Sequence, residues 1–196
     1  MGRISVPLSG WSTGFADFNN DGWKDLFVTC SHVNDLIEKF EAQKYKLHNA
    51  VFVQAPAGMF QDLSSTAGLN ASTPKAHRGA AIADFNGDGK LDVAVSALNE
   101  PAELWENVSS SGGNWLILKL EGVKSNRDGI GARVRADKQH NQMTTSFGYA
   151  SSTLQGVHFG LGVKAFVEEV EIRWPSGTIQ KLQNVKANQT LAIREP

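Results

Sequence analysis

The chain has 196 residues, of which 41% are hydrophobic and 20% charged, and its formal net charge is −1. These values are ordinary for a folded protein, and the near-neutral balance gives no electrostatic case for nucleic acid or an anionic membrane as the main partner. A single cysteine, Cys30, excludes an intrachain disulfide and a cysteine-based zinc site. Because no apolar run approaches about 18 residues and no apolar h-region follows the N-terminus, we expect no membrane span and no signal peptide in this chain.

An acidic sequence that occurs twice is the strongest organising signal. The first copy, "ADFNNDGWKD", covers residues 16–25, and the second, "ADFNGDGKLD", covers residues 83–92. In each copy, a segment of small and apolar residues leads into the acidic loop and an alternating apolar segment leaves it, which is typical of two strands. A repeated unit of this kind predicts a repeat architecture.

The first unit holds about four predicted strands. Residues 34–45, "NDLIEKFEAQKY", interrupt the strand pattern and predict a short helix, capped by Asn34 or Asp35, that leaves the sheet. Residues 49–65 predict a β-hairpin with its turn at residues 56–58, "PAG". Four strands joined in this way are one blade of a β-propeller.

The second unit is shorter and ends in a linker. After "LDVAVSAL" comes one more predicted strand, "AELWENV", and then the Ser/Gly-rich run "SSSGGN" at residues 109–114. Such a run marks a domain boundary. We therefore assign a repeat region to residues 1–108, with blade units at about 9–68 and 76–108, a linker to residues 109–114, and a second domain to residues 115–196.

Beyond the linker, the hydrophobic pattern again has a period of two. Segments such as "WLILKLEG" (115–122), "QMTTSFGYA" (142–150) and "VEIRW" (170–174) predict about seven strands. With no convincing helix pattern, a small antiparallel β-sandwich is the economical fold. The predicted fold class is all-β, with a partial β-propeller of one to two blades followed by this sandwich.

The acidic loops place oxygen-bearing side chains at alternate positions. With Asp17 as position 1, positions 3, 5 and 9 are Asn19, Asp21 and Asp25, and Gly22 at position 6 permits the sharp turn. A hard cation held by about six to eight oxygens is the usual state of calcium, and carboxylates this close repel one another without a cation. The predicted ligands of two Ca²⁺ ions are Asp17, Asn19, Asp21, the backbone carbonyl of Trp23, Asp25, Asp84, Asn86, Asp88, the backbone carbonyl of Lys90, and Asp92.

Three other interpretations of the loops are weaker. An EF-hand needs Glu at position 12 and flanking helices, whereas position 12 is Val28 in one loop and Val95 in the other. Magnesium prefers to keep its waters and rarely uses a cage of many protein oxygens. An Asn/Asp/Gly turn with solvated charges explains one such loop, but two matches at equivalent places of a repeat favour calcium in a structural role.

These residues resemble known families. The two units look like FG-GAP (VCBS-type) repeats, the calcium-loop blades of integrin α-chain-like propellers. The second domain resembles the ASPIC and UnbV domain of cartilage acidic protein-like proteins of the bacterial type. The segments that carry this second resemblance are "NWLILKLEG" (114–122), "SNRDGIGARVR" (125–135), "HFGLG" (158–162), "EIRWPSG" (171–177) and "NQTLAIRE" (188–195).

The resemblance implies a rigid, calcium-stabilised platform that recognises an unknown protein or glycan, secreted or at the cell surface or in the periplasm. No nucleophile–base motif occurs, so we expect a non-enzymatic module with no catalytic residue. A fragment of a calcium-dependent enzyme acting on polysaccharide and a purely structural module stay open as alternatives. Because a propeller closes with about four to eight blades, we expect this chain to be the C-terminal part of a longer protein, with further blades upstream.

The remaining candidate residues have structural interpretations. We expect His158 to make a structural hydrogen bond, and the "NRDGIGA" segment (126–132) to form a turn before a strand rather than a phosphate loop. Arg133 and Arg135 are interpreted as a solvated strand face, with binding of acidic ligands as the alternative.

Overall fold

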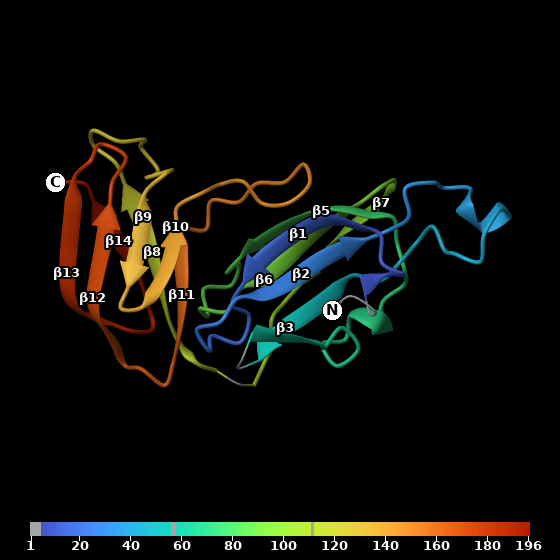
Figure 1. Cartoon of the computed structure of the whole chain (residues 1–196), viewed down its shortest axis with the longest axis horizontal. Helices are drawn as coiled ribbons and strands as arrows, with labels where there is room; N and C mark the ends of the chain where they lie inside the picture. Colours follow the sequence, from blue (N-terminus) through green and yellow to red (C-terminus); the bar gives the residue numbers. More distant parts are fainter. Residues whose placement is uncertain (1–4, 56–57, 111) are drawn as a thin grey trace.

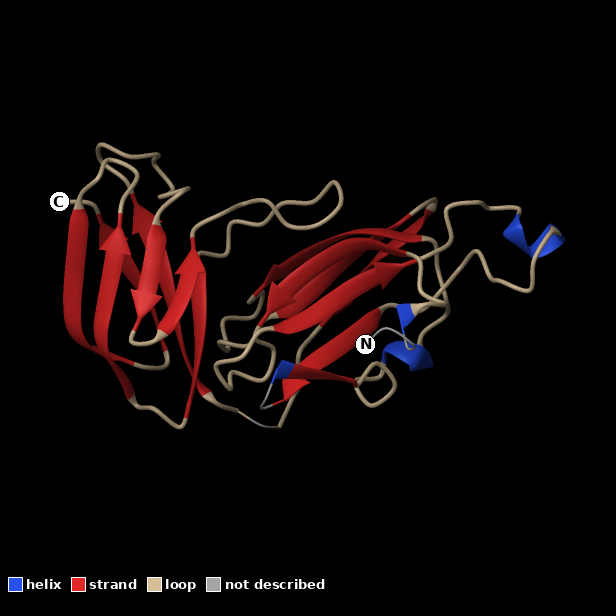
Figure 2. Cartoon of the chain, in the orientation of Figure 1, coloured by secondary structure: helices blue, strands red, loops and turns tan. Residues whose placement is uncertain are grey.

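Four β-sheets form the framework of the protein (Figure 2). The computed structural model describes residues 5–55, 58–110 and 112–196. Two sheets form the N-terminal half and two form the C-terminal half, and the halves lie end to end along the long axis (Figure 1). The expected all-β class is confirmed. Within the described ranges, no helix is long and apolar enough to cross a membrane.

The first sheet is one blade-like unit in which each strand runs antiparallel to its neighbours. The predicted hairpin is confirmed, because Ala55 of the third strand pairs with Met59 of the fourth. Its turn residues Pro56 and Ala57 lie outside the described residues. In the order in which they pair, the strands are β1 (Gly10–Ala16), β2 (Asp25–Cys30), β3 (Ala50–Ala55) and β4 (Met59–Asp62).

The short helix predicted within residues 34–45 is confirmed only in part, because it is limited to one turn and neither Asn34 nor Asp35 caps it. A single 3-10 turn, η1 (Ile37–Lys39), forms there, and Ile37 is its buried residue. Leu36 and Phe40 are 47% and 73% exposed, so a longer helix would have no apolar face packed on the protein and would gain too little from packing to persist. Instead, the side-chain oxygen of Asn34 accepts a hydrogen bond from the Leu36 amide (2.9 Å), which closes a local turn.

The second sheet has three strands and packs beside the first. Its antiparallel strands are β5 (His77–Ala83), β6 (Asp92–Ala97) and β7 (Glu100–Trp105), and a 3-10 turn, η3 (Leu69–Ala71), precedes them. β5 lies against β1 and β2. The two sheets share an apolar core that includes Phe27, Ile82 and Val93. Each blade-like unit therefore covers apolar side chains of the other.

The C-terminal half is a sandwich of seven strands, as predicted. One sheet has the order β10-β9-β12-β13 and the other β11-β8-β14, and their inner faces bury a core that includes Leu116, Val134 and Ile172. The strands are β8 (Asn114–Glu121), β9 (Arg133–Ala136), β10 (Gln139–Gln142), β11 (Val157–Gly162), β12 (Phe166–Arg173), β13 (Ile179–Lys186) and β14 (Gln189–Arg194).

One strand pair corrects the expectation of a wholly antiparallel sandwich. β14 runs parallel to β8, with Leu191 opposite Leu118. The chain enters β14 from β13, which belongs to the other sheet. A connection that crosses between sheets does not impose the antiparallel pairing that a hairpin imposes within one sheet.

The predicted strand over residues 142–150 is wrong. β10 ends at Gln142, and residues 143–156 form a long segment, called here the docking loop, that extends over β1 and β5 (Figure 1). The Phe147 side chain packs against the core shared by the first two sheets, and the Thr153 hydroxyl donates to the Ile82 carbonyl (2.9 Å). The apolar residues of this segment therefore pack on the N-terminal sheets instead of forming a strand of the sandwich.

Candidate functional site

Loop 1 (residues 17–25) connects β1 to β2 and is closed by its own acidic side chains. The two oxygens of Asp17 accept hydrogen bonds from the amides of Asp21 (3.1 Å) and Gly22 (2.8 Å). Asp21 in turn accepts from the Trp23 amide (2.8 Å), and the Asn19 carbonyl oxygen accepts from the Asp21 amide (3.1 Å). Backbone N–H groups thus carry part of the compensating positive charge that the carboxylates require.

Loop 2 (residues 84–92) connects β5 to β6 with the same pattern. Asp84 accepts from the amides of Asp88 (3.1 Å) and Gly89 (2.9 Å). Asp88 accepts from the Lys90 amide (2.8 Å), and Asn86 accepts from the Asp88 amide (3.0 Å). The sequence repeat is therefore a repeat of hydrogen-bond geometry as well.

The last aspartate of each loop fastens the loop to a neighbouring strand or segment. Asp25 accepts from the amides of Phe18 and Gln54, both at 2.9 Å, and Gln54 belongs to β3. Asp92 accepts from the amides of Phe85 (2.9 Å) and Asn107 (2.8 Å). Both carboxylates are buried, Asp25 at 0% and Asp92 at 2% exposure, and each oxygen keeps a further lone pair that is free to bind a cation.

The electrostatics of loop 1 are those of carboxylates withdrawn from water. Burial raises the pKa of Asp17 to about 7, against the opposing effect of the Gly22 amide and the Lys24 ammonium. Burial likewise raises the pKa of Asp25, although the amides of Gln54 and Phe18 oppose it. Lys24 is itself partly withdrawn from water, which lowers its pKa. In loop 2 the residue at this position is the buried Leu91, and the lysine of that loop is the preceding residue, Lys90.

The oxygen donors of the loops are of the type that calcium binds, but the described residues do not form a preassembled metal site. Among the described residues no group of three or more His, Cys, Asp or Glu side chains is arranged to hold a metal ion. The predicted sets also use Asn oxygens and backbone carbonyls, and no described residue donates a hydrogen bond to the carbonyl of Trp23 or Lys90. These hard oxygens are the ligand type that calcium takes. Calcium at the two loops therefore stays a prediction.

Both loops are packed against the C-terminal sandwich, which the sequence did not indicate. The Gly162 amide of β11 donates to the Asn20 carbonyl of loop 1 (2.8 Å). The Asn20 side-chain amide donates to the Gly89 carbonyl of loop 2 (3.2 Å). His158 of β11 is buried, and its Nε2 lies 3.3 Å from the same Gly89 oxygen. One carbonyl thus joins loop 1, loop 2 and the sandwich.

His158 therefore has the structural role expected of it. Burial, together with the nearby Lys24 ammonium, lowers the pKa of His158 to about 3, so the ring is neutral near pH 7. Because Gly89 offers a carbonyl oxygen, Nε2 must carry the proton and donate it. Nδ1 then holds a lone pair and has no hydrogen-bond partner among the described residues.

Glycine is required where the sandwich touches the loops. A Cβ atom on Gly160 would lie 2.0 Å from Oδ2 of Asp17 and 2.6 Å from Cα of Asn20. A Cβ on Gly89 would lie 1.8 Å from the indole of Trp115 in β8. Contacts this close leave no room for a side chain, so the "HFGLG" segment of β11 is shaped to receive loop 1.

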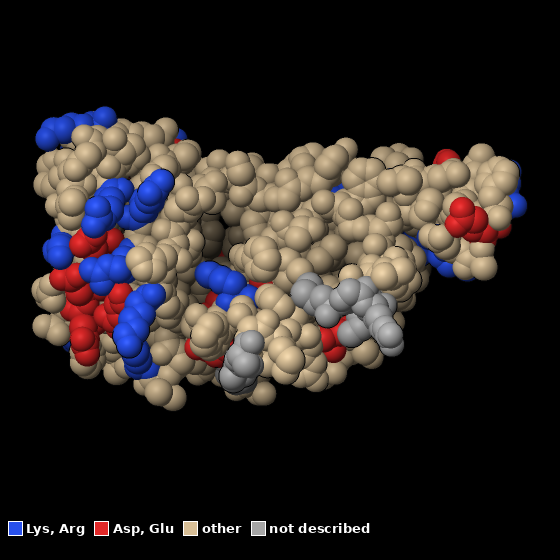
Figure 3. Space-filling view, in the orientation of Figure 1, with Lys and Arg blue, Asp and Glu red and all other residues tan. Residues whose placement is uncertain are grey.

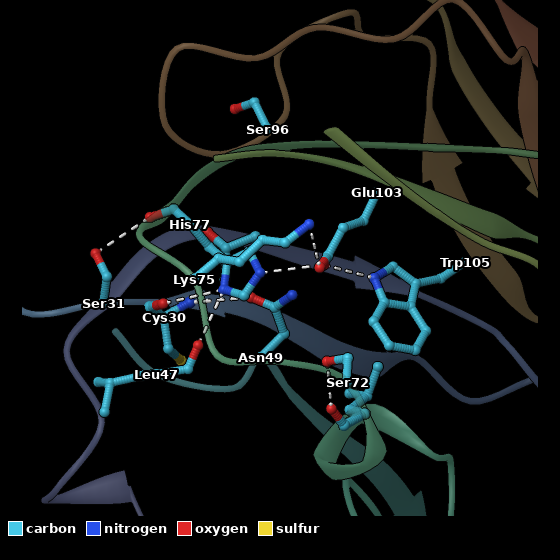
Figure 4. A network of polar contacts seen from close by, with 12 residues as sticks. Cys30, Ser31, Leu47, Asn49, Ser72, Lys75, His77, Ser96, Glu103 and Trp105 are labelled. Carbon is cyan, nitrogen blue, oxygen red and sulfur yellow. Dashed lines mark hydrogen bonds and ion pairs between the residues drawn. The ribbon is translucent and has the colours of Figure 1, made fainter. Parts of the chain in front are cut away.

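A second polar cluster joins the two blade-like units. His77 of β5 is fully buried, with Nδ1 3.3 Å from the Cys30 carbonyl and 3.1 Å from the Leu47 carbonyl, and Nε2 3.1 Å from Glu103 (Figure 4). All three partners are hydrogen-bond acceptors, so Nδ1 faces two carbonyl oxygens and Nε2 faces the Glu103 carboxylate. The cluster holds the first unit to the second.

Glu103 is matched to this role. Burial raises its pKa, but hydrogen bonds from Lys75 and Trp105, together with the charge of His77, lower it overall. No described serine or cysteine is placed as a nucleophile on His77: the Ser31 hydroxyl donates to the His77 carbonyl (3.3 Å) instead of the ring, and burial raises the pKa of Cys30 to about 12. The cluster is a structural ion pair in its geometry.

Comparison with known proteins finds two kinds of domain. Residues 17–95 match the family described as FG-GAP-like repeat, residues 78–113 match the FG-GAP repeat, and residues 122–196 match the family described as ASPIC and UnbV. Cartilage acidic protein 1 of Xenopus tropicalis is 28% identical over 128 residues, which cover 60% of this chain and 20% of that relative. The resemblance inferred from the acidic repeats and the C-terminal segments is confirmed.

Proposed function

We propose, on the basis of the FG-GAP repeats and the ASPIC and UnbV domain that this chain carries, that it is a non-enzymatic, calcium-binding recognition or scaffold module. Its place of action would be the secreted, cell-surface or periplasmic space. The observation that supports this most is the pair of acidic loops, which have the same residue types at the same positions and share one hydrogen-bond pattern. The match spans about a fifth of the relative's length, so further blades upstream belong to the proposal.

Calcium would act on structure in this proposal rather than on a reaction. The ion would be held by Asp17, Asn19, Asp21, Asp25 and the Trp23 carbonyl in loop 1, and by the equivalent residues in loop 2. Its charge would remove the repulsion among the loop carboxylates, of which Asp17, Asp25 and Asp92 are buried. Because Asn20 and Gly89 hold the sandwich, an ordered pair of loops would also fix the sandwich on the blades.

A thermal melting series tests the calcium proposal. We expect calcium, but not magnesium, to raise the melting temperature above that in chelator. At a calcium concentration ten times the dissociation constant, each site would add about 1.4 kcal/mol, which corresponds to roughly 3–6 °C for a chain of this size. The double variant Asp21→Ala with Asp88→Ala should lose this rise.

The control is Asp35→Ala, which removes an exposed carboxylate outside both loops. It should retain the full rise with calcium. Equal rises with calcium and magnesium, or a rise that persists in the double variant, would contradict calcium binding at the loops.

A further inference from the structure

The outer face of the sheet β10-β9-β12-β13 carries an unusual arrangement of charge. Arg133 of β9 and Arg173 of β12 lie directly opposite each other across the strand pair. Like charges in this position destabilise a sheet. Gln142 of β10 is the partner of Arg133 on its other side, so no carboxylate lies beside Arg133 in this row.

The next row of the same face is compensated. Arg135, again on β9, pairs with Glu169 and lies 3.5 Å from Glu171. Glu171 also receives Lys181 at 3.2 Å, and Arg173 reaches it along its own strand at 2.8 Å. The guanidinium of Arg133, by contrast, makes no hydrogen bond or ion pair with any described residue. Cationic side chains therefore outnumber carboxylates on these two rows.

The arginine pair borders a depression of about 660 Å³. Beside Arg133 and Arg173, its polar lining residues are Arg135, His140, Asn141, Gln142 and Glu171. Lys/Arg and Asp/Glu side chains gather over this sheet in the space-filling view, at the left of Figure 3. The Glu171 carboxylate in this lining is already paired with Arg135, Arg173 and Lys181. The hollow thus offers guanidinium groups, an imidazole and the Gln142 amide to one ligand.

We propose that this depression binds an acidic carbohydrate, with the Arg133 and Arg173 guanidiniums on a carboxylate or sulfate group of the sugar. Arginine forks match such oxyanions with two parallel hydrogen bonds. An acidic peptide would ordinarily add apolar or aromatic anchors. The one aliphatic residue among the described lining residues, Val134, is 2% exposed. The polar lining suits sugar hydroxyls instead. The site does not depend on calcium at the loops.

Calorimetric titration in chelator at low salt tests the site. The probes are an unsulfated uronate tetrasaccharide, a sulfated one, a neutral tetrasaccharide and a hexaglutamate peptide. We expect at least one acidic sugar to bind, with the two acidic arms distinguishing carboxylate from sulfate, and the neutral sugar not to bind. In Arg133→Gln, the loss of one charged hydrogen-bonding group should weaken binding about tenfold.

The control is Arg194→Gln, an equal change in charge on β14, where Arg194 lies 3.5 Å from Glu121. It should leave binding unchanged. Arg133→Gln should melt no lower than the wild type, because it removes a like-charge contact, so a loss of binding would not reflect unfolding. Failure of both acidic sugars to bind, equal weakening in both variants, or tighter binding of hexaglutamate would overturn the proposal.

Discussion

At the scale of single residues, buried carboxylates in this protein are neutralised by backbone amides. Glu195 is the clearest case, since it is 3% exposed and one of its oxygens accepts hydrogen bonds from three successive amides. Burial raises its pKa, but the Ser176 hydroxyl and the amides of Ser125 and Val123 lower it overall to about 2. The loops use the same device: the Asp17 carboxylate accepts hydrogen bonds from two loop amides and the Asp84 carboxylate from three.

Glu195 should make the stability of the fold depend on pH at the acid end. Its folded pKa of about 2 lies below the ordinary glutamate value of 4.5, so the unfolded state binds the proton first as pH falls. The contribution of Glu195 is therefore complete above about pH 4.5 and is lost as pH falls toward 2. Denaturant unfolding of wild type and Glu195→Gln should show a steeper loss of stability in the wild type over this window. Parallel curves would contradict this assignment.

Gly160 tests the contact between loop 1 and the sandwich. Its missing side chain admits Asp17 and Asn20, so Gly160→Ala would overpack a closed contact, at a cost of typically about 1–3 kcal/mol. We expect denaturant unfolding to show that loss. Gly112→Ala is the matched control, because a Cβ there meets no atom within 4 Å. Equal stability of the two variants would contradict a tight contact at Gly160.

At the scale of elements, the docking loop joins the sandwich to β1 and β5, the first strands of the two blade-like units. The Phe147 ring packs directly on Gly14 of β1, so a Cβ atom added to Gly14 would lie 1.5 Å from the ring. Ser151 packs on Gly79 of β5, where an added Cβ would lie 2.5 Å from the Ser151 hydroxyl oxygen. Tyr149 packs edge-on against Trp11 of β1, with ring centroids 4.9 Å apart. The loop thus covers β1 and β5 with side chains of the other domain.

Truncating Phe147 should loosen this junction. Phe147→Ala removes a half-buried ring from a shared core, and we expect a loss of about 1–3 kcal/mol in the free energy of unfolding. Hydrogen exchange should show faster exchange in β1 and β5. Leu154→Ala is the control, since Leu154 lies in the same loop and is 57% exposed. If Phe147→Ala exchanged and unfolded like this control, the docking loop would not be a structural junction.

At the scale of the whole molecule, the sequence predicted what short-range patterns encode. The Asp/Asn spacing of residues 17–25 and 84–92 located both loops, and alternation located most strands, because both signals lie within about ten residues. The contact of Asn20 and His158 with Gly89 joins residues 69 positions apart, and no local pattern marks such a pair. The sequence did contain one signal, the glycines at positions 89 and 160. Only the fold shows why no side chain fits there, because neighbouring atoms occupy the place of a Cβ.

Two departures from the predictions have the same origin. The helix over residues 34–45 and the strand over residues 142–150 were predicted from local periodicity. Phe40 remains exposed, while Phe147 packs on another domain. Which apolar face is buried, and against what, is decided by tertiary packing, and this overrides a weak local preference.

The central claim is that the two acidic loops each bind one calcium ion, and direct titration of calcium into the chain tests it. For the wild type, we expect two binding events, with dissociation constants on the order of 10⁻⁴–10⁻³ M, as in extracellular modules. One event should remain in Asp88→Ala and none in the double variant with Asp21→Ala, while Asp35→Ala keeps both. No binding at millimolar calcium, or an unchanged stoichiometry in the double variant, would contradict the claim.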